Sequence, residues 1–155
     1  MFILSFSMLL VGSHAIASPD GKDKGVMETI RSFVVEVKAT SDDAARAKRA
    51  SDLAAYIAAL SRDQVKSIDS TAVGEVASLL EDNYNGVKHF AAIALGGIGP
   101  GAVSAIPALE KGIADLEREE DAAIVKPSMP AAIELYIALH KIDGRPLPNK
   151  YMPKK

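Results

Sequence analysis

The chain contains no cysteine. This absence excludes disulfide bonds, thiol catalysis, thiolate metal sites and a lipid anchor on a cysteine. Aromatic residues are also scarce, at 5% of the chain, although 48% of the residues are hydrophobic. Alanine fills the gap with twenty-five copies, and it favours helices over strands. We therefore expect a single all-α domain that is held together by packing alone.

The chain also lacks the features of a nucleic-acid binder or an enzyme. Its formal net charge is -2, and no basic stretch is interleaved with aromatic residues, so no nucleic-acid partner is expected. His89 and His140 have no carboxylate at a ligand spacing. Gly96-Gly97-Ile98-Gly99 follows an expected helix rather than the strand that precedes a phosphate loop. We predict no enzyme activity, no metal site and no cofactor.

The first residues have the pattern of a secretion signal. Phe2 to Val11 is a short apolar run, and His14-Ala15-Ile16-Ala17 contains the small-x-small motif that signal peptidase accepts. Roughly ten apolar residues cannot span a bilayer, which takes about twenty. We predict a signal peptide over residues 1–17 and a linker over residues 18–23, where Pro19-Asp20-Gly21 prevents a helix. The mature chain is expected to be periplasmic or secreted, with no membrane span.

Apolar residues then recur at helical spacing in six segments. Ser41, Ser61 and Asn85 are the expected N-caps, and Gly99-Pro100-Gly101 is the expected turn between the fourth and fifth helices. Val103 is among the residues expected to be buried in the fifth helix. The expected helices cover residues 26–38, 42–60, 71–81, 86–98, 102–118 and 129–142, with a short turn over 61–68. The short connections predict that sequential helices pack antiparallel.

One stretch carries more than helical periodicity. Leu79-Leu80-Glu81-Asp82 is followed by Val87-Lys88 and by the small-residue run from Ala91 to Pro100, and together they resemble a bacterial HEAT repeat. Residues 102–109 resemble the start of the next repeat. In this family the turn aspartate, here Asp82, can cap the backbone amides that follow it. The resemblance implies a short right-handed α-solenoid of about three HEAT-like hairpins over residues 24–144, followed by a Pro/Lys-rich tail over 145–155.

Two departures from the family pattern stand out. Lys88 occupies a position where the family prefers arginine, which weakens bidentate pairing to an aspartate in a neighbouring repeat. Residues 119–128 form an insertion where the family has a tight turn.

The register of the repeat also predicts a binding surface. It places His89 and Ile93 on the outward side of their helix, and Ile133, Ile137 and Lys141 on the outward side of the last helix, where repeats usually carry charged residues. Such an apolar stripe suits a partner helix or an extended peptide. The alternative is that the tail, residues 146–152, folds back and covers the stripe as a terminal cap.

We therefore expect an exported, non-catalytic protein-binding scaffold or adaptor of the cell envelope, whose partner is another protein or a peptide. Two alternatives stay open. One is an inhibitor or immunity protein that blocks an exported toxin or hydrolase. The other is an accessory protein of an enzyme, because some HEAT-type repeats occur in chromophore lyases. A solenoid of this size offers a broad face rather than a deep catalytic pocket.

Overall fold

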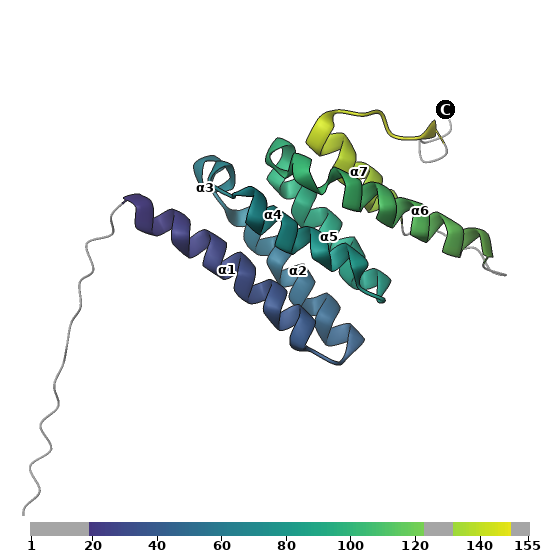
Figure 1. Cartoon of the computed structure of the whole chain (residues 1–155), viewed down its shortest axis with the longest axis horizontal. Helices are drawn as coiled ribbons and strands as arrows, with labels where there is room; N and C mark the ends of the chain where they lie inside the picture. The colour runs from purple at the N-terminus through teal and green to yellow at the C-terminus, as the bar shows by residue number, and fades with distance from the viewer. Residues whose placement is uncertain (1–18, 123–131, 150–155) are drawn as a thin grey trace, which may run out of the picture.

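The computed structural model describes residues 19–122 and 132–149, and every regular element within these ranges is helical (Figure 1). The all-α prediction is confirmed. The predicted signal peptide, residues 1–17, lies outside the described residues. In chain order the elements are α1 (Pro19–Ala39), α2 (Asp43–Ala59), α3 (Arg62–Lys66), α4 (Ser70–Ala77), the 3-10 segment η1 (Ser78–Glu81), α5 (Asn85–Ile98), the 3-10 segment η2 (Gly99–Ala105), α6 (Ile106–Ala122) and α7 (Ile133–Asp143).

The first helix begins earlier than the apolar pattern predicts. Residues 19–23 were expected to be linker, but α1 starts at Pro19. Proline suits the first position of a helix because the N–H that it lacks would have no intrahelical partner there. The buried stripe of α1 includes Val26, Ile30 and Val37, which are residues that the periodicity selects.

Side-chain caps fix the starts of α2 and α3. The carboxylate of Asp42 accepts a hydrogen bond from the backbone N–H of Ala45 at 2.7 Å, so the cap lies one residue after the expected Ser41. An aspartate at this position satisfies a free amide and places negative charge at the positive end of the helix dipole. Ser61 and Gln64 form the expected capping box of α3.

The start of α5 differs from the prediction. Tyr84 occupies the N-cap position without a side-chain cap, and Asn85 is the first helical residue. The carboxylate of Asp82 accepts a hydrogen bond from the backbone N–H of Tyr84 at 2.8 Å. The predicted role of Asp82, to cap an amide in the turn that follows it, is therefore confirmed.

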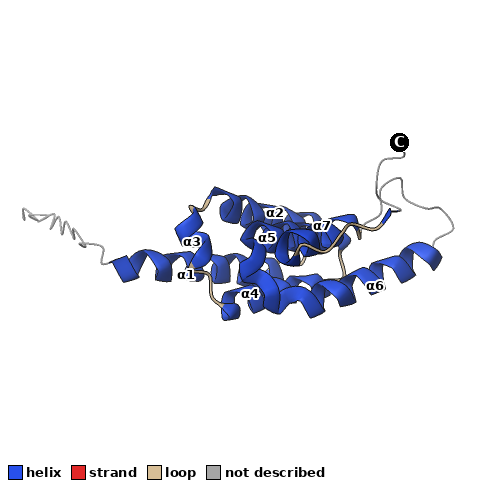
Figure 2. Ribbon diagram, turned by 90° about the horizontal axis from the view of Figure 1, so that it is seen from above, coloured by secondary structure: helices blue, strands red, loops and turns tan. Residues whose placement is uncertain are grey.

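The helices pair along the chain and form two layers (Figure 2). The pairs are α1 with α2, α4 and η1 with α5, and α6 with α7. In one layer α2 contacts α5 and α5 contacts α7. In the other layer α1 contacts α4, which contacts η2, and η1 contacts α6. Each pair therefore packs against the next, and α5 lies between α2 and α7.

The core lies between these layers and consists of aliphatic side chains. Val103 departs from the prediction, because it is 55% exposed. The segment Gly99–Ala105 is a 3-10 helix, whose period of three places Ala102 and Ala105 on the buried side and turns Val103 toward solvent. The largest fully buried side chains include Ile30, Leu53, Ile57, Leu79, Leu95, Leu109, Leu116, Leu135 and Leu139.

The chain from α5 to α6 contains a long apolar stretch. By length and composition alone, the stretch Asn85–Glu119 is long and apolar enough to cross a membrane, and half of its most apolar window is buried inside the structure. It is interrupted at Gly99, which has φ 66° and ψ -137°, a conformation that only glycine adopts readily. In this structure the stretch supplies the centre of the helical core.

Candidate functional site

The residues predicted to bind a partner lie on two neighbouring helices of one layer. His89 and Ile93 belong to α5, and Ile133, Ile137 and Lys141 belong to α7, which contacts α5. Lys141 is exposed, whereas His89 and the three isoleucines are half-buried. Ile93 also packs against the core. The isoleucines therefore present only part of their side chains to solvent.

The backbones of α5 and α7 approach each other closely at Gly96. A Cβ atom on Gly96 would lie 3.3 Å from the Cα atom of Ala138 and 3.3 Å from Cδ of Lys141. The methylene stem of Lys141 thus lies over α5, while a long charged side chain of this kind keeps its amine in water. The predicted residues on α7 are held beside α5 by this small-residue contact.

The solvent side of the α2–α5–α7 layer carries small and apolar residues beside the ion pair of Lys48 with Asp52 on α2 and the polar side chains of His89 and Lys141. The small and apolar residues recur at three- and four-residue intervals along each helix, between the positions that form the core. We call this surface the outer face. It consists of Ser51, Ala55 and Ala58 on α2, Phe90, Ile93 and Gly97 on α5, and Ile133 and Ile137 on α7.

The opposite layer has a different surface chemistry. Nε of Arg31 on α1 lies 2.9 Å from Oε1 of Glu75 on α4, and Nζ of Lys111 on α6 lies 3.7 Å from Oε1 of Glu81 on η1. These ion pairs cross from one helix to the next at the surface. A partner that covered this layer would have to desolvate ion pairs that join neighbouring helices, whereas the surface pair on the other layer, Lys48 with Asp52, lies within α2 beside the apolar residues. The outer face is therefore the better candidate for binding.

A groove opens at one end of the outer face, where α3 lies beside α2 and α5. We call it the basic groove. Its volume is about 350 Å³, and its lining residues are Ile57, Ala58, Leu60, Arg62, Val65, Lys66 and Gly97. The spacing of three and four residues puts Arg62, Val65 and Lys66 on one side of α3. The groove thus combines apolar walls with two basic side chains.

A second cleft contains charges that largely neutralise one another. It has a volume of about 230 Å³ and lies between the turn before α5 and the exposed side of α6. Glu81 and Asp115, which line it, both pair with Lys111, and Asp115 also pairs with Arg118. With its charges already balanced, this cleft favours neither an anion nor a cation.

Lys88 and Glu119 also line this cleft, and neither forms an ion pair within the described residues. Nη1 of Arg46, the fourth residue of α2, lies 3.2 Å from Oδ2 of Asp82 and links the first pair of helices to the second. Lys88 is the fourth residue of α5 and so occupies the equivalent place. It is only 8% exposed, and its amine forms no hydrogen bond or ion pair across the ranges that the structure describes. Arg46 therefore joins the first helix pair to the second by an ion pair, whereas Lys88 forms no equivalent ion pair with the described residues of the third.

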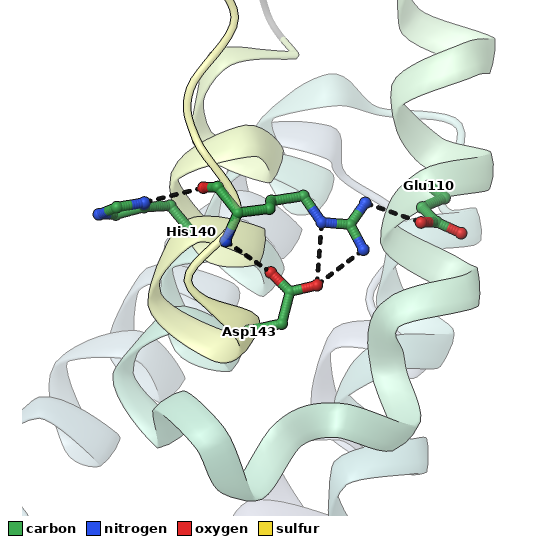
Figure 3. Close-up of polar contacts among 4 residues, drawn as sticks. Glu110, His140 and Asp143 are labelled. Carbon is green, nitrogen blue, oxygen red and sulfur yellow. Dashed lines mark hydrogen bonds and ion pairs between the residues drawn. The ribbon is translucent and has the colours of Figure 1, made fainter.

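Arg145 anchors the start of the tail (Figure 3). Its Nη1 donates to Glu110 on α6 at 2.8 Å, and its Nε and Nη2 donate to Asp143 at 2.9 and 2.7 Å. Nδ1 of His140 lies 2.9 Å from the carbonyl oxygen of Arg145. The hydrogen bonds from Arg145 hold the pKa of Asp143 below its ordinary value, and the bonds to Asp143 and Glu110 raise the pKa of Arg145. This cluster ties α7 to α6.

Potential metal ligands do not gather at one place in the described part of the chain. Among these residues, no group of three or more His, Asp or Glu side chains could hold a metal ion. The predictions of no metal, no cofactor and no enzyme activity stay predictions. Calorimetry with zinc tests the first of them, because a specific site would saturate at a one-to-one ratio.

Sequence reasoning missed the basic groove, although one signal was available. Arg62, Val65 and Lys66 follow the capping serine Ser61, so their shared face on one helical turn could have been read from the sequence. That this face lies beside Gly97 depends on tertiary packing, which spacing along the chain does not predict.

Comparison of the chain with protein-family models, with curated proteins and with solved structures finds no match. Its function is therefore inferred from geometry.

Proposed function

We propose that this chain is an exported, non-catalytic protein-binding scaffold of the cell envelope, and that its helix pairs are three HEAT-like repeats stacked as a short right-handed α-solenoid. Two observations support the stack. The second helices α2, α5 and α7 contact one another in chain order, and so do the first helices. The ion pair between Arg46 and Asp82 joins the first repeat to the second. Stacked repeats present a continuous face that suits a protein partner.

The outer face is the observation that carries the proposal. Ile93, Ile133 and Ile137 keep part of their apolar surface in water, and burying such a side chain completely is worth about 1.5–3 kcal/mol. A partner that covers the outer face gains part of this free energy without breaking the ion pairs of the opposite layer. An apolar patch beside a charged surface is the usual mark of a protein–protein contact.

Matched substitutions on the two layers test the proposal. The wild-type protein is used to capture partners from the envelope fraction, which are identified by mass spectrometry. Ala55→Arg and Ile137→Asp on the outer face should abolish capture of the same protein. Ala114→Arg and Val35→Asp, at exposed positions of the opposite layer, should leave capture intact. Equal capture by all four variants would contradict the proposal, and melting curves establish that each variant is folded.

The alternative to a partner is that the tail covers Ile133 and Ile137. In its described part, Leu147 and Pro148 are half-buried, and Arg145 is anchored to Glu110. A chain ending after Arg145 keeps this anchor and removes the rest of the tail. If a partner covers the outer face, the truncated chain should melt within about 2 °C of the full chain, because surface changes rarely exceed about 0.5 kcal/mol. A fall of several degrees in the melting temperature would show that the tail covers the isoleucines.

Export is tested separately by intact mass. The motif Ala15-Ile16-Ala17 predicts a mature chain that begins at Ser18. The protein recovered from the periplasm or medium should have the mass of residues 18–155. Recovery only from the cytosol, with Met1 retained, would contradict export.

A further inference from the structure

The basic groove has an apolar floor and one open wall. Ile57 on the floor is buried, while Leu60 and Val65 are half-buried. Gly97 forms the open wall because it has no side chain; a Cβ atom on it would crowd Cγ2 of Ile57 at 3.2 Å. The volume of about 350 Å³ lies at the small end of the range of ligand pockets, about 300–1,000 Å³. The groove therefore suits a short apolar group rather than a large ligand.

The rim of the groove carries two basic side chains that form no ion pair with a described carboxylate. Arg62 and Lys66 are exposed and lie one turn apart on α3, on either side of Val65. No carboxylate lines the groove. Neither basic side chain forms an ion pair within residues 19–122 and 132–149. Negative charge on a ligand would thus meet two free cations beside an apolar floor.

We propose that the basic groove binds an acidic peptide segment in which an apolar side chain is flanked by aspartate or glutamate. The apolar side chain lies over Ile57 and against Val65. The flanking carboxylates accept hydrogen bonds from Arg62 and Lys66. This inference rests on the proposed function, because it specifies the kind of segment that the partner presents.

A peptide fits these features better than an anionic lipid surface does. Recognition of such membranes typically uses clusters of about 4–8 basic residues, whereas the rim offers two. The apolar residues of the groove line an open depression bordered by α2, α3 and α5 and do not form a projecting hydrophobic face that could enter a bilayer.

Fluorescence anisotropy with three labelled peptides tests the inference on the full mature chain. The first peptide is Gly-Ser-Glu-Glu-Leu-Glu-Glu-Ser-Gly. The second has serine in place of leucine, and the third has lysine in place of each glutamate. The first peptide should bind about tenfold more tightly than either control, since each control removes one of the two recognised features. Its affinity should fall with added salt, as exposed charge pairs are screened.

Charge reversal on the rim provides the matched variant. Arg62→Glu with Lys66→Glu should weaken the first peptide by about tenfold or more, through lost ion pairs and like-charge repulsion. Lys38→Glu with Arg118→Glu makes the same change in net charge at exposed residues that do not line the groove and should leave binding unchanged. Melting curves confirm that both variants fold.

Three results would overturn the inference. They are equal binding of all three peptides, no saturable binding of the first peptide, and rim-dependent binding to vesicles of equal parts phosphatidylglycerol and phosphatidylcholine in place of the peptide. Failure here is distinguishable from failure of the proposed function. If the groove variant captures the envelope partner normally while Ile137→Asp does not, protein binding stands and the assignment of the groove is wrong.

Discussion

At the scale of single residues, Lys88 is the buried charged side chain among those that the structure describes. It is 8% exposed and lacks the acceptor that Arg46 has in the preceding helix pair. Its stem is buried, whereas its amine reaches the cleft beside α6 and forms no hydrogen bond or ion pair within the described residues. The free energy that Lys88 contributes to folding therefore comes from its methylene groups.

This asymmetry makes a prediction for two substitutions at Lys88. Lys88→Met keeps the stem and removes the amine, so the free energy of unfolding should stay equal or rise. Lys88→Ala removes the stem as well and should lower it by about 1–2 kcal/mol. Urea unfolding measures both. A large loss in Lys88→Met would mean that the amine has a stabilising partner after all.

Asp143 predicts a pH dependence. Its hydrogen bonds from Arg145 lower its folded-state pKa below the unfolded value of about 3.9. The stabilisation from this carboxylate is therefore fully present above about pH 4 and is lost as the pH falls through the folded pKa. Asp143→Asn should be less stable than wild type at pH 7, and the difference should narrow on acidification. Unfolding curves between pH 7 and pH 2 check this, and a constant difference would contradict it.

At the scale of elements, Gly74 and Gly96 have different roles in helix packing. A Cβ atom on Gly74 in α4 would have no neighbouring atom within 4 Å, whereas a Cβ on Gly96 would lie 3.3 Å from the backbone Cα of Ala138. Gly96 sets the distance between α5 and α7. Gly74 only lowers the helix propensity of α4.

The two glycine-to-alanine substitutions should thus differ in sign. Gly74→Ala should stabilise the protein by about 0.5–1 kcal/mol through helix propensity. Gly96→Ala should destabilise it, because the backbone of α7 must move to admit the methyl group. Thermal unfolding of the two single variants makes the comparison. Stabilisation by both would show that α7 can shift without cost.

The sequence predicted helices better than it predicted their ends. Periodicity located the apolar face of every described α-helix longer than two turns, because burial of one stripe leaves a pattern along the chain. It failed at Pro19, where composition suggests a break but the geometry of a first helical position allows a helix. It failed again at Val103, because a 3-10 segment changes the period from about 3.6 residues to three.

The candidate site was predictable only in part. Spacing placed His89 and Ile93 on one helix and Ile133 and Ile137 on another. How far these side chains are buried depends on the distance between helices, which Gly96 sets across the layer. The basic groove depends on where α3 lies against α5, and no pattern within residues 61–68 contains that information.

At the scale of the whole molecule, α5 holds the structure together. It contacts α2 on one side and α7 on the other, and Leu95 within it is completely buried. Leu95→Ala should lower the free energy of unfolding by about 2–5 kcal/mol, as cavity-forming core changes do. Val103→Ala, at a 55% exposed position, is the control and should change it by no more than about 0.5 kcal/mol. Similar effects of the two substitutions would mean that the register of α5 is wrong.

Neighbouring helices are joined by different kinds of contact in the two layers. Within the α2–α5–α7 layer, a Cβ on Gly86 would lie 3.2 Å from Cβ of Ala47, and a Cβ on Gly96 would lie 3.3 Å from Cα of Ala138. The α1–α4–α6 layer is joined at its surface by long side chains, such as Arg31 to Glu75. Short contacts between small residues resist displacement, whereas ion pairs of exposed side chains tolerate it.

Bending of the molecule should therefore not be shared equally between the layers. The α2–α5–α7 layer, where small residues are in close contact, should keep its helix spacing. The helix pairs should then open or close on the side of the ion pairs. Salt screens the exposed ion pairs and should therefore affect that side more than the α2–α5–α7 layer. The outer face lies on the α2–α5–α7 layer. A partner would thus meet a surface whose shape is already set before contact, and little conformational entropy would be lost on binding.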